Sequence, residues 1–285
     1  MTRRKRRTSS APPPAHAGDK RAARDHPGRD RSRSPRWLWL YGRHAVAAAL
    51  ANPTRRCRRL VASPSALADL DHRPDARLRR PGLRVETVPR AEFGAALPRG
   101  ALSPGAVHQG LALEVAALEA PTIEAACALP DEPEATPVVV VLDRVSDPQN
   151  LGAALRAAAA FGARAVVLPE RHAPSEGGAL AKAASGALEC VPLVRVTNLA
   201  RALQTLKRLD YWCVGLDAAA SDPLAAAKPG GAVALVFGAE GAGLRRLTRE
   251  HCDLLARVPI SSAVESLNLA AAVAVALYEI AGRDA

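Results

Sequence analysis

The chain has 285 residues, of which 48% are hydrophobic, enough for one large domain or two modest domains with real cores. No apolar run reaches the roughly 18 residues that a membrane span needs, and no apolar segment follows the basic N-terminus as in a secretory signal. These patterns exclude membrane-spanning and secreted classes. The five cysteines have neither zinc-site spacing nor the even number of a disulfide framework, so we expect a cytoplasmic protein without metal.

The formal net charge of +11 is unevenly distributed along the chain. Residues 1–36 hold 12 Lys and Arg against 3 Asp, a net +9, and residues 37–116 hold 12 against 6 acidic residues, a net +6. Residues 117–136 hold 5 acidic and no basic residues, and residues 137–285 are almost neutral at 15 against 14. This asymmetry favours a nucleic-acid-binding first part. A compositional bias, with 34 Arg against 5 Lys, is an alternative source of the charge.

The first part of the chain divides into a tail, a small domain and a linker. Residues 1–36 have almost no aliphatic side chains, which predicts a disordered basic tail that either tethers RNA or has no specific role. Residues 37–117 are predicted to form a small α/β domain, and the acidic, proline-bearing residues 118–136 a linker. Within the domain we predict a turn at Gly42, a helix over residues 43–51, and strands over residues 58–63, 83–89 and 110–118.

Residues 137–285 alternate between strand and helix patterns. Continuous apolar strands are typical of a buried parallel sheet, so we predict an α/β fold in which helices cover both faces of a parallel sheet. Ligands bind such sheets beyond the carboxyl ends of the strands. The predicted strands cover residues 137–143, 163–169, 189–196, 211–217, 232–238 and 254–260, and the predicted helices cover residues 150–161, 198–209 and 265–281.

Three unusual loops follow these strands. They are "SDPQN" at residues 146–150, "FGAEGAG" at residues 237–243 and "VPISSAVESLN" at residues 258–268. Because the strands are predicted to be parallel, all three loops lie at one edge of the sheet. In the third loop, Ser266 is the expected cap of the last helix, which leaves the neighbouring amide of Asn268 without an explanation.

The glycine cluster in the second loop has some likeness to a dinucleotide-binding loop. Such a loop belongs in the first strand–helix turn and is followed by an acidic residue on the next strand, whereas this cluster comes late and contains Glu240. A nicotinamide-dependent dehydrogenase is therefore disfavoured. A plain turn with a helix cap remains the alternative to a ligand-binding role for these glycines.

The segments "DPQNLGAALRAA", "VFGAEGAGLRRLT" and "VPISSAVESLNLAAAVAVALYE" together resemble the three motifs of the SpoU-type 2′-O-ribose RNA methyltransferases of the SPOUT superfamily. The resemblance covers roughly residues 137–282 and departs at Glu265, where a small hydroxyl residue is usual. "YGRHAVAAAL" and "HQGLALEV" resemble the small RNA-binding domain of bacterial members that modify a guanosine of 23S rRNA. The resemblance implies a trefoil-knotted domain that binds S-adenosylmethionine at the knot, and a homodimer.

The same resemblance implies which residues form the site. Arg156 matches the catalytic arginine, for which we expect stabilisation of the developing alkoxide and a grip on the adjacent phosphate. Glu240 is expected to orient Arg156 or a substrate group, and Ser266 and Asn268 to hold polar atoms of substrate or cofactor. The expected catalytic residues are Asn150, Arg156, Glu240, Ser266 and Asn268, and the expected cofactor-binding residues are Gly215, Leu216, Gly238, Val258, Ile260 and Leu267.

The predicted reaction is methyl transfer from S-adenosylmethionine to the ribose 2′-hydroxyl of a guanosine in 23S rRNA, either as naked RNA or in a ribosome-assembly intermediate. A tRNA ribose 2′-O-methyltransferase is the alternative within the class, and the folded domain at residues 37–117 favours rRNA over it. A non-catalytic RNA-binding assembly factor is the alternative outside the class. The presence of Asn150, Arg156, Glu240 and Asn268 counts against that alternative.

Overall fold

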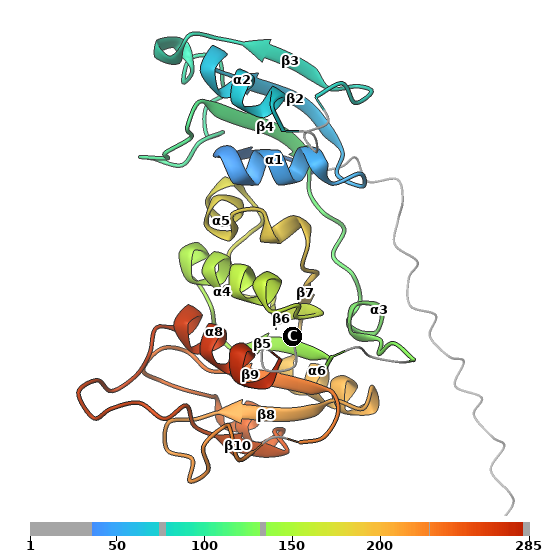
Figure 1. Cartoon of the computed structure of the whole chain (residues 1–285), viewed down its shortest axis with the longest axis vertical. Coiled ribbons are helices and arrows are strands. Elements are labelled where there is room, and N and C mark those ends of the chain that lie inside the picture. The colour runs from blue at the N-terminus through green and yellow to red at the C-terminus, as the bar shows by residue number, and fades with distance from the viewer. Residues whose placement is uncertain (1–35, 74–77, 132–134, 228, 282–285) are drawn as a thin grey trace, which may run out of the picture. The chain divides into compact units, whose positions relative to one another are not determined.

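The computed structural model describes residues 36–73, 78–131, 135–227 and 229–281, and these belong to one compact unit (Figure 1). The predicted basic tail, except for its last residue, lies outside the described residues. None of the helices in these ranges has the length and hydropathy to span a bilayer.

The N-terminal domain is built on a four-stranded mixed sheet with the strand order β1-β4-β2-β3. β4 pairs antiparallel with β1 and β2, and β3 lies parallel to β2. The predicted turn is present at Gly42, whose φ of 90° suits a glycine. The elements are β1 (Trp37–Tyr41), α1 (Arg43–Ala51), β2 (Cys57–Ala62), α2 (Pro64–Asp71), β3 (Arg84–Thr87), the 3-10 turn η1 (Arg90–Glu92) and β4 (Leu111–Ala116).

The predicted helix and the three predicted strands of this domain are confirmed, but two elements were not expected. The apolar segment before Gly42 is strand β1, which closes one side of the sheet against β4. Helix α2 follows β2 directly: Ser63 caps it by accepting from the Ala66 N–H at 3.4 Å, and Pro64 occupies its first turn. A serine cap followed by proline is a helix start signal that the sequence did contain.

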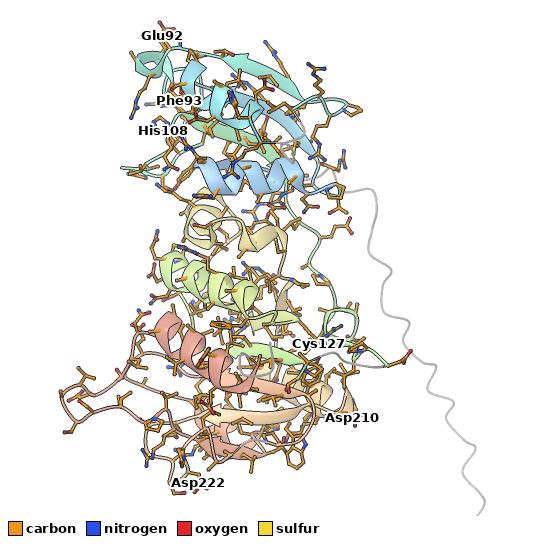
Figure 2. All side chains as sticks on the ribbon, in the orientation of Figure 1. Glu92, Phe93, His108, Cys127, Asp210 and Asp222 are labelled. Atoms are coloured by element: carbon orange, nitrogen blue, oxygen red, sulfur yellow. The ribbon has the colours of Figure 1, made fainter. Side chains whose placement is uncertain are left out.

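A small aromatic contact closes the outer face of this domain. Phe93 is 1% exposed, and its ring stacks on the ring of His108 at a centroid distance of 4.2 Å (Figure 2). Burial lowers the pKa of His108 below its usual value, so the ring is neutral at pH 7. His108 therefore packs as an aromatic side chain rather than as a cation.

The C-terminal domain contains a six-stranded sheet with the order β10-β8-β9-β5-β6-β7, in which every pair is parallel. The parallel sheet predicted from the apolar strands is confirmed. Its strands are β5 (Val138–Leu142), β6 (Ala165–Pro169), β7 (Leu193–Val196), β8 (Trp212–Leu216), β9 (Val233–Phe237) and β10 (Leu254–Ala256). The remaining elements are α3 (Ile123–Cys127), α4 (Pro148–Ala160), α5 (Gly178–Ala184), the 3-10 turn η2 (Ala187–Glu189), α6 (Leu199–Arg208), α7 (Arg246–Glu250) and α8 (Leu269–Ile280).

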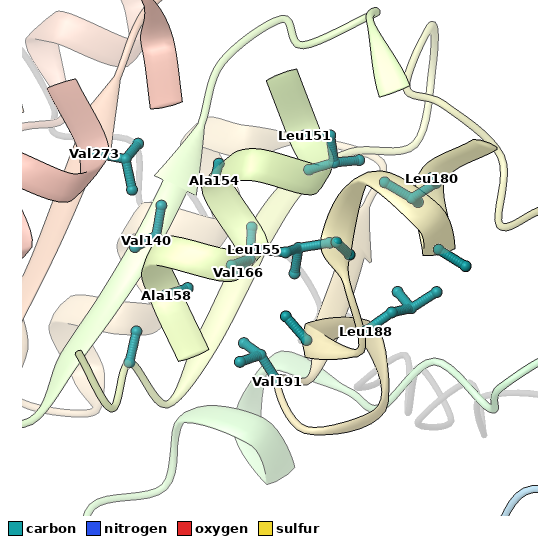
Figure 3. Packing of buried hydrophobic residues seen from close by; sticks show 14 of the residues in the cluster. Val140, Leu151, Ala154, Leu155, Ala158, Val166, Leu180, Leu188, Val191 and Val273 are labelled. Atoms are coloured by element: carbon teal, nitrogen blue, oxygen red, sulfur yellow. The ribbon is translucent and has the colours of Figure 1, made fainter. Parts of the chain in front are cut away.

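Helices cover both faces of this sheet, as predicted. Along β5, Val138, Val140 and Leu142 pack into the core that contains α4 and α8, part of which Figure 3 shows. Val139 and Val141 pack into a second core on the opposite face, formed with α3 and α6. Every residue of β5 is buried because successive side chains alternate between two covered faces.

The structure corrects the sequence predictions for this half at several places, including the short α7 and η2, which were not predicted. The expected linker contains the short helix α3, which is capped by Thr122 and packs against α6. Helix α5 was not predicted, and it packs tightly enough on α4 that a Cβ at Gly152 would lie 2.3 Å from the Ala183 Cβ. The last helix begins at Leu269 rather than at residue 265. The trefoil knot stays a prediction.

A buried arginine joins the N-terminal domain to the C-terminal one. Arg55 is 1% exposed and forms ion pairs with Glu176 at 2.7 Å and with Glu189 at 2.8 Å. Its guanidinium also donates to the carbonyl of Ala116 at 2.9 Å, and Asn52 donates to Glu189 at 2.8 Å. Because a buried charge needs compensating partners, the cluster fixes the domains against each other.

Candidate active site

The first loop at the carboxyl edge of the sheet starts helix α4. Asp147 caps the helix by accepting from the backbone N–H groups of Gln149 at 3.0 Å and Asn150 at 3.4 Å, and Pro148 occupies the first turn. This capping geometry places Asn150 in the first turn of the helix, beyond the carboxyl end of β5. The amide is therefore presented at the edge where ligands bind such sheets.

Glu240 of the glycine-rich loop joins all three predicted motifs. Its Oε1 accepts from the side-chain amide of Asn150 at 3.2 Å, from that of Asn268 at 3.0 Å and from the backbone N–H of Leu269 at 2.9 Å. The Asn268 amide also donates to the Oδ1 atom of Asn150 at 3.0 Å. Three of the five predicted catalytic residues thus form one hydrogen-bonded group, although they lie up to 118 positions apart in the sequence.

The other two predicted catalytic residues lie outside this group. Arg156 is exposed on α4 and is not among the partners of Glu240 in the described chain, so the orientation of a substrate group is the part of the Glu240 prediction that remains, and it stays a prediction. The helix-capping role expected of Ser266 is also wrong. Asn268 caps α8 by accepting from the Ala270 N–H at 2.9 Å, and this explains the amide at the start of the helix.

The glycine-rich loop folds back on itself as a tight hairpin. Ala239 and Gly243 form an antiparallel bridge, with hydrogen bonds of 2.9 and 3.1 Å in the two directions. A Cβ at Gly238 would lie 2.1 Å from the carbonyl carbon of Gly243, so only glycine fits there. Gly241 and Gly243 have φ values of 73° and 63°. The loop's own path, without any ligand, accounts for these glycines.

A pocket of about 360 Å³ opens beside this hairpin. Five of the six residues predicted to bind the cofactor line it. The sixth, Gly215, is buried within β8, where a Cβ would meet Leu255, Cys252 and Leu244 within 2.9 Å, so it serves the packing of the strand instead. The pocket is lined by Leu216, Asp217, Ala218, Phe237, Gly238, Ala239, Glu240, Gly241, Gly243, Val258, Ile260, Glu265, Ser266, Leu267, Leu269 and Ala272.

The pocket lining combines apolar side chains with negatively charged ones. Asp217, Glu240 and Glu265 are its charged members, and no Lys or Arg lines it. Asp217 is already paired with Arg249 at 2.6 Å, so the field in the pocket comes mainly from the other two carboxylates. Such a lining suits a ligand that carries both an apolar or aromatic part and a positive charge.

Asp143 ties two of the edge loops together and was not among the residues predicted from the sequence. Its side chain is fully buried, and its carboxylate accepts from the Thr248 hydroxyl at 2.8 Å and from the Arg245 backbone N–H at 3.3 Å. It also pairs with the Arg245 guanidinium at 2.5 Å. A carboxylate at the end of a fully apolar strand is the signal that could have indicated this role.

Three thiols of the C-terminal domain are unsuited to nucleophilic chemistry. Burial raises the pKa of Cys213 and of Cys252 to about 12, and that of Cys127 to about 11. All three are therefore protonated at neutral pH. Among the described residues, no cluster of three or more His, Cys, Asp or Glu side chains could hold a metal ion.

Comparison with known proteins agrees with this geometry. The SpoU rRNA methylase family model matches residues 137–278, and a model described as RNA 2′-O ribose methyltransferase substrate binding matches residues 39–121. The fold resembles that of the SpoU methyltransferase AviRb from Streptomyces viridochromogenes, with a TM-score of 0.68 at 20% identity over 87% of this chain and 90% of that one. An rRNA methyltransferase from Sinorhizobium meliloti gives a TM-score of 0.65 at 22% identity over 87% and 88%.

Fold and family models define the class as an RNA methyltransferase with a separate substrate-binding domain. Among curated relatives, a 23S rRNA (guanosine-2′-O-)-methyltransferase RlmB from Pseudomonas aeruginosa is 38% identical over 251 residues, 86% of this chain and 96% of the relative. Its namesake from a Burkholderia species is 41% identical over 249 residues, with 86% and 96% coverage. The chain belongs to the SpoU rRNA methylase family.

Proposed function

We propose that the protein transfers a methyl group from S-adenosylmethionine to the ribose 2′-hydroxyl of a guanosine in 23S rRNA. The observation that carries this proposal is that Asn150, Glu240 and Asn268 are hydrogen-bonded to one another beside an acidic pocket that Glu240 lines. This site lies in a chain of the SpoU rRNA methylase family. The similarity to RlmB proteins over most of both chains supports the choice of substrate.

The pocket residues fit the proposed cofactor. S-adenosylmethionine has an adenosine part and carries positive charge on its sulfonium and amino groups. Leu216, Val258 and Leu267 offer apolar surface for the adenosine part, and Glu240 and Glu265 offer negative charge for the cationic groups. When bound, the cofactor supplies an activated methyl group, so the protein is left with the tasks of orientation and proton handling.

The hydrogen-bonded group holds its amides in fixed positions. Glu240 accepts three hydrogen bonds, and this immobilises Asn150 and Asn268 at the edge of the sheet before substrate arrives. Preorganised polar groups of this kind orient a ribose hydroxyl at no further cost in entropy. We assign Asn150 and Asn268 to this positioning and leave Ser266 as a contact at the pocket wall.

Arg156 is assigned to the transition state. Its exposed guanidinium on α4 is available to an RNA phosphate and to the developing 2′-alkoxide. A guanidinium does not give up its proton near neutral pH, so we assign it electrostatic stabilisation rather than proton removal. This role does not require a contact between Arg156 and Glu240.

We also propose a homodimer that acts in the cytoplasm, where ribosomal RNA is modified. Helix α8 leaves Val275 44% and Tyr278 57% exposed, and both lie on the helix that packs beside α4 (Figure 1). Large apolar side chains exposed together on one helix are typical of a protein interface. Sedimentation of the purified chain should give twice the monomer mass, and Tyr278→Glu should shift it toward the monomer.

Methylation mapping tests the proposed reaction. RNA from a strain that lacks the gene should lose one 2′-O-methylguanosine from 23S rRNA, and expression of the wild-type chain, but not of Arg156→Ala, should restore it. Loss of a tRNA methyl group instead would favour the alternative substrate. An unchanged set of methylated riboses in both RNAs would favour the non-catalytic assembly factor.

A further inference from the structure

A second hollow lies at the same edge of the C-terminal sheet. It has a volume of about 910 Å³ and is lined by residues that follow β5, β6 and β7 and by residues 245–248. We call it the basic groove, because its charged and titratable lining consists of Arg144, Arg171, His172, Arg245 and Arg246. No carboxylate lines it. Positive charge is thus concentrated at one place in a domain that is almost neutral overall.

Two of the arginines are available to a ligand. Arg245 pairs with the buried Asp143, and Arg246 pairs with Glu250 at 2.6 Å. For Arg144 and Arg171, which are both exposed, no acidic partner exists within the described part of the chain. Guanidinium groups without partners are well suited to bidentate contact with phosphate oxygens.

The groove is held in shape by buried and strained elements. Asp143 anchors the segment of Arg245 and Thr248 against the end of β5 by the contacts described above. Arg144 and His172 have φ values of 67° and 65°, in the left-handed region that such residues rarely adopt. Non-glycine residues in this region cost free energy, so the surrounding structure must hold both residues in place.

The groove and the candidate active site draw on neighbouring stretches of the chain. Arg144 lies six positions before Asn150 in the loop between β5 and α4. Arg245 lies five positions after Glu240 in the segment that follows the glycine-rich hairpin. Two of the four segments that line the groove are therefore close in sequence to Asn150 and Glu240 of the hydrogen-bonded group. An RNA strand bound in the groove would be held by the segments that also carry these two residues.

We propose that the basic groove binds the sugar-phosphate backbone of the RNA beside the methylated nucleotide. This inference rests on the proposed function. Arginines supply the charge, and the hydroxyl and amide groups of Ser146, Thr197 and Asn198 in the lining supply neutral contacts to phosphate and sugar. Such contacts fix the register of the strand and are independent of base sequence.

The groove favours a nucleic acid over an acidic protein. Phosphates repeat at short, regular intervals along RNA, and the four arginines of the lining come from three separate segments, with Arg144 and Arg171 unpaired in the described chain. The described lining contains no Phe, Tyr or Trp, the side chains that most often anchor a protein partner, and its large aliphatic members are Val145, Leu199 and Leu247. An acidic protein is the competing occupant that the experiment must detect.

The test compares two charge-matched double variants of the full chain. Arg144→Gln/Arg171→Gln removes the two unpaired arginines, and glutamine adds no β-branch at the left-handed position of residue 144. Arg201→Gln/Arg208→Gln on α6 removes the same charge outside the lining. Binding of 23S rRNA transcribed in vitro is measured by filter retention across a KCl series. Affinity for S-adenosylmethionine, binding of polyglutamate and the rate at saturating RNA are measured in parallel.

The groove variant should bind the RNA about tenfold more weakly at ~0.1 M KCl, with a log–log salt slope shallower by about 1.5. Its cofactor affinity and its rate at saturating RNA should match those of the control. Equal salt slopes in the groove variant and the control would overturn the proposal, and so would a defect confined to polyglutamate. A wild-type chain that binds RNA but neither binds cofactor nor methylates would contradict the proposed function while leaving this test valid.

Discussion

The acidic pocket and the basic groove occupy one edge of one sheet and differ in the sign of their charge. The pocket lies over β8 and β9 and is lined by Asp217, Glu240 and Glu265. The groove lies beyond β5, β6 and β7, and its charged lining is entirely basic. The proposed donor is cationic and the proposed acceptor is a polyanion, so each hollow attracts one substrate and repels the other.

The group formed by Asn150, Glu240 and Asn268 joins the pocket, through Glu240, to the first turn of α4, which follows the groove residues 144–146. A nearly neutral domain thus accommodates two substrates of opposite charge by separating its acidic and basic side chains along the strand order. Three substitutions and one deletion test this division, and they are taken in order of decreasing effect.

Arg156→Ala should leave cofactor binding intact and remove the chemistry. Arg156 lines neither the pocket nor the groove, and its assigned role is stabilisation of charge in the transition state. We expect the rate of tritiated methyl transfer to fall by about 100-fold or more, with cofactor affinity by calorimetry unchanged. Activity within a few-fold of wild type would remove Arg156 from the reaction.

Gly238→Val should damage the pocket and spare the groove. A side chain at residue 238 meets the backbone of Gly243, so the hairpin must shift and with it the wall that carries Glu240. We expect S-adenosylmethionine to bind at least tenfold more weakly, about 1.4 kcal/mol, and the melting temperature to fall. The salt slope of RNA binding serves as the control. Lower stability with normal cofactor affinity would show that this hairpin does not form the cofactor wall.

Deletion of residues 1–36 should affect RNA binding without touching either hollow. The deletion removes 12 basic and 3 acidic residues, a net +9. RNA affinity should fall by about fivefold at ~0.1 M salt, with a shallower salt slope and an unchanged rate at saturating RNA. Combining the deletion with the groove variant sharpens the comparison, because independent contacts should add. An unaltered salt slope in the deletion variant alone would show that the tail does not contribute to RNA binding.

Glu265→Gln should give the smallest effect, because this carboxylate is exposed. Removing its charge should weaken the binding of S-adenosylmethionine by about threefold. The product S-adenosylhomocysteine lacks the sulfonium charge, so its affinity should change less, and the ratio of the two affinities isolates the electrostatic contribution. Equal losses for both ligands would show that Glu265 acts through contact and not through charge.

How far the sequence predicts this site depends on how local each signal is. Asn150, Glu240 and Asn268 were found because they stand in recognisable motifs, and parallel strands necessarily bring their loops to one edge. The bonds among them depend on side-chain directions that no spacing contains. The same reason explains why Ser266 was mistaken for the helix cap: both a serine and an asparagine stood near the helix start, and only the backbone geometry selects Asn268.

The elements that were missed were short or lacked a clear period. Helix α5 has seven residues and helix α3 has five, too few for a helical pattern to stand out from an alanine-rich background. Strand β1 is a continuous apolar run that could equally have entered a helix. The basic groove combines residues from four separate segments, so its charges become a cluster only after the chain has folded.

The pairing of Arg55 with Glu176 and Glu189 also sets an order of events during synthesis. The partners lie 121 and 134 positions downstream of the arginine. At roughly 5–20 residues per second, they leave the ribosome about 6 to 27 seconds after Arg55 does. Through that interval the Arg55 side chain stays hydrated, because the C-terminal segments that carry Glu176 and Glu189 have not yet been synthesised. An interruption of translation before Glu189 would therefore release a domain whose intended contact surface still carries an unpaired cation.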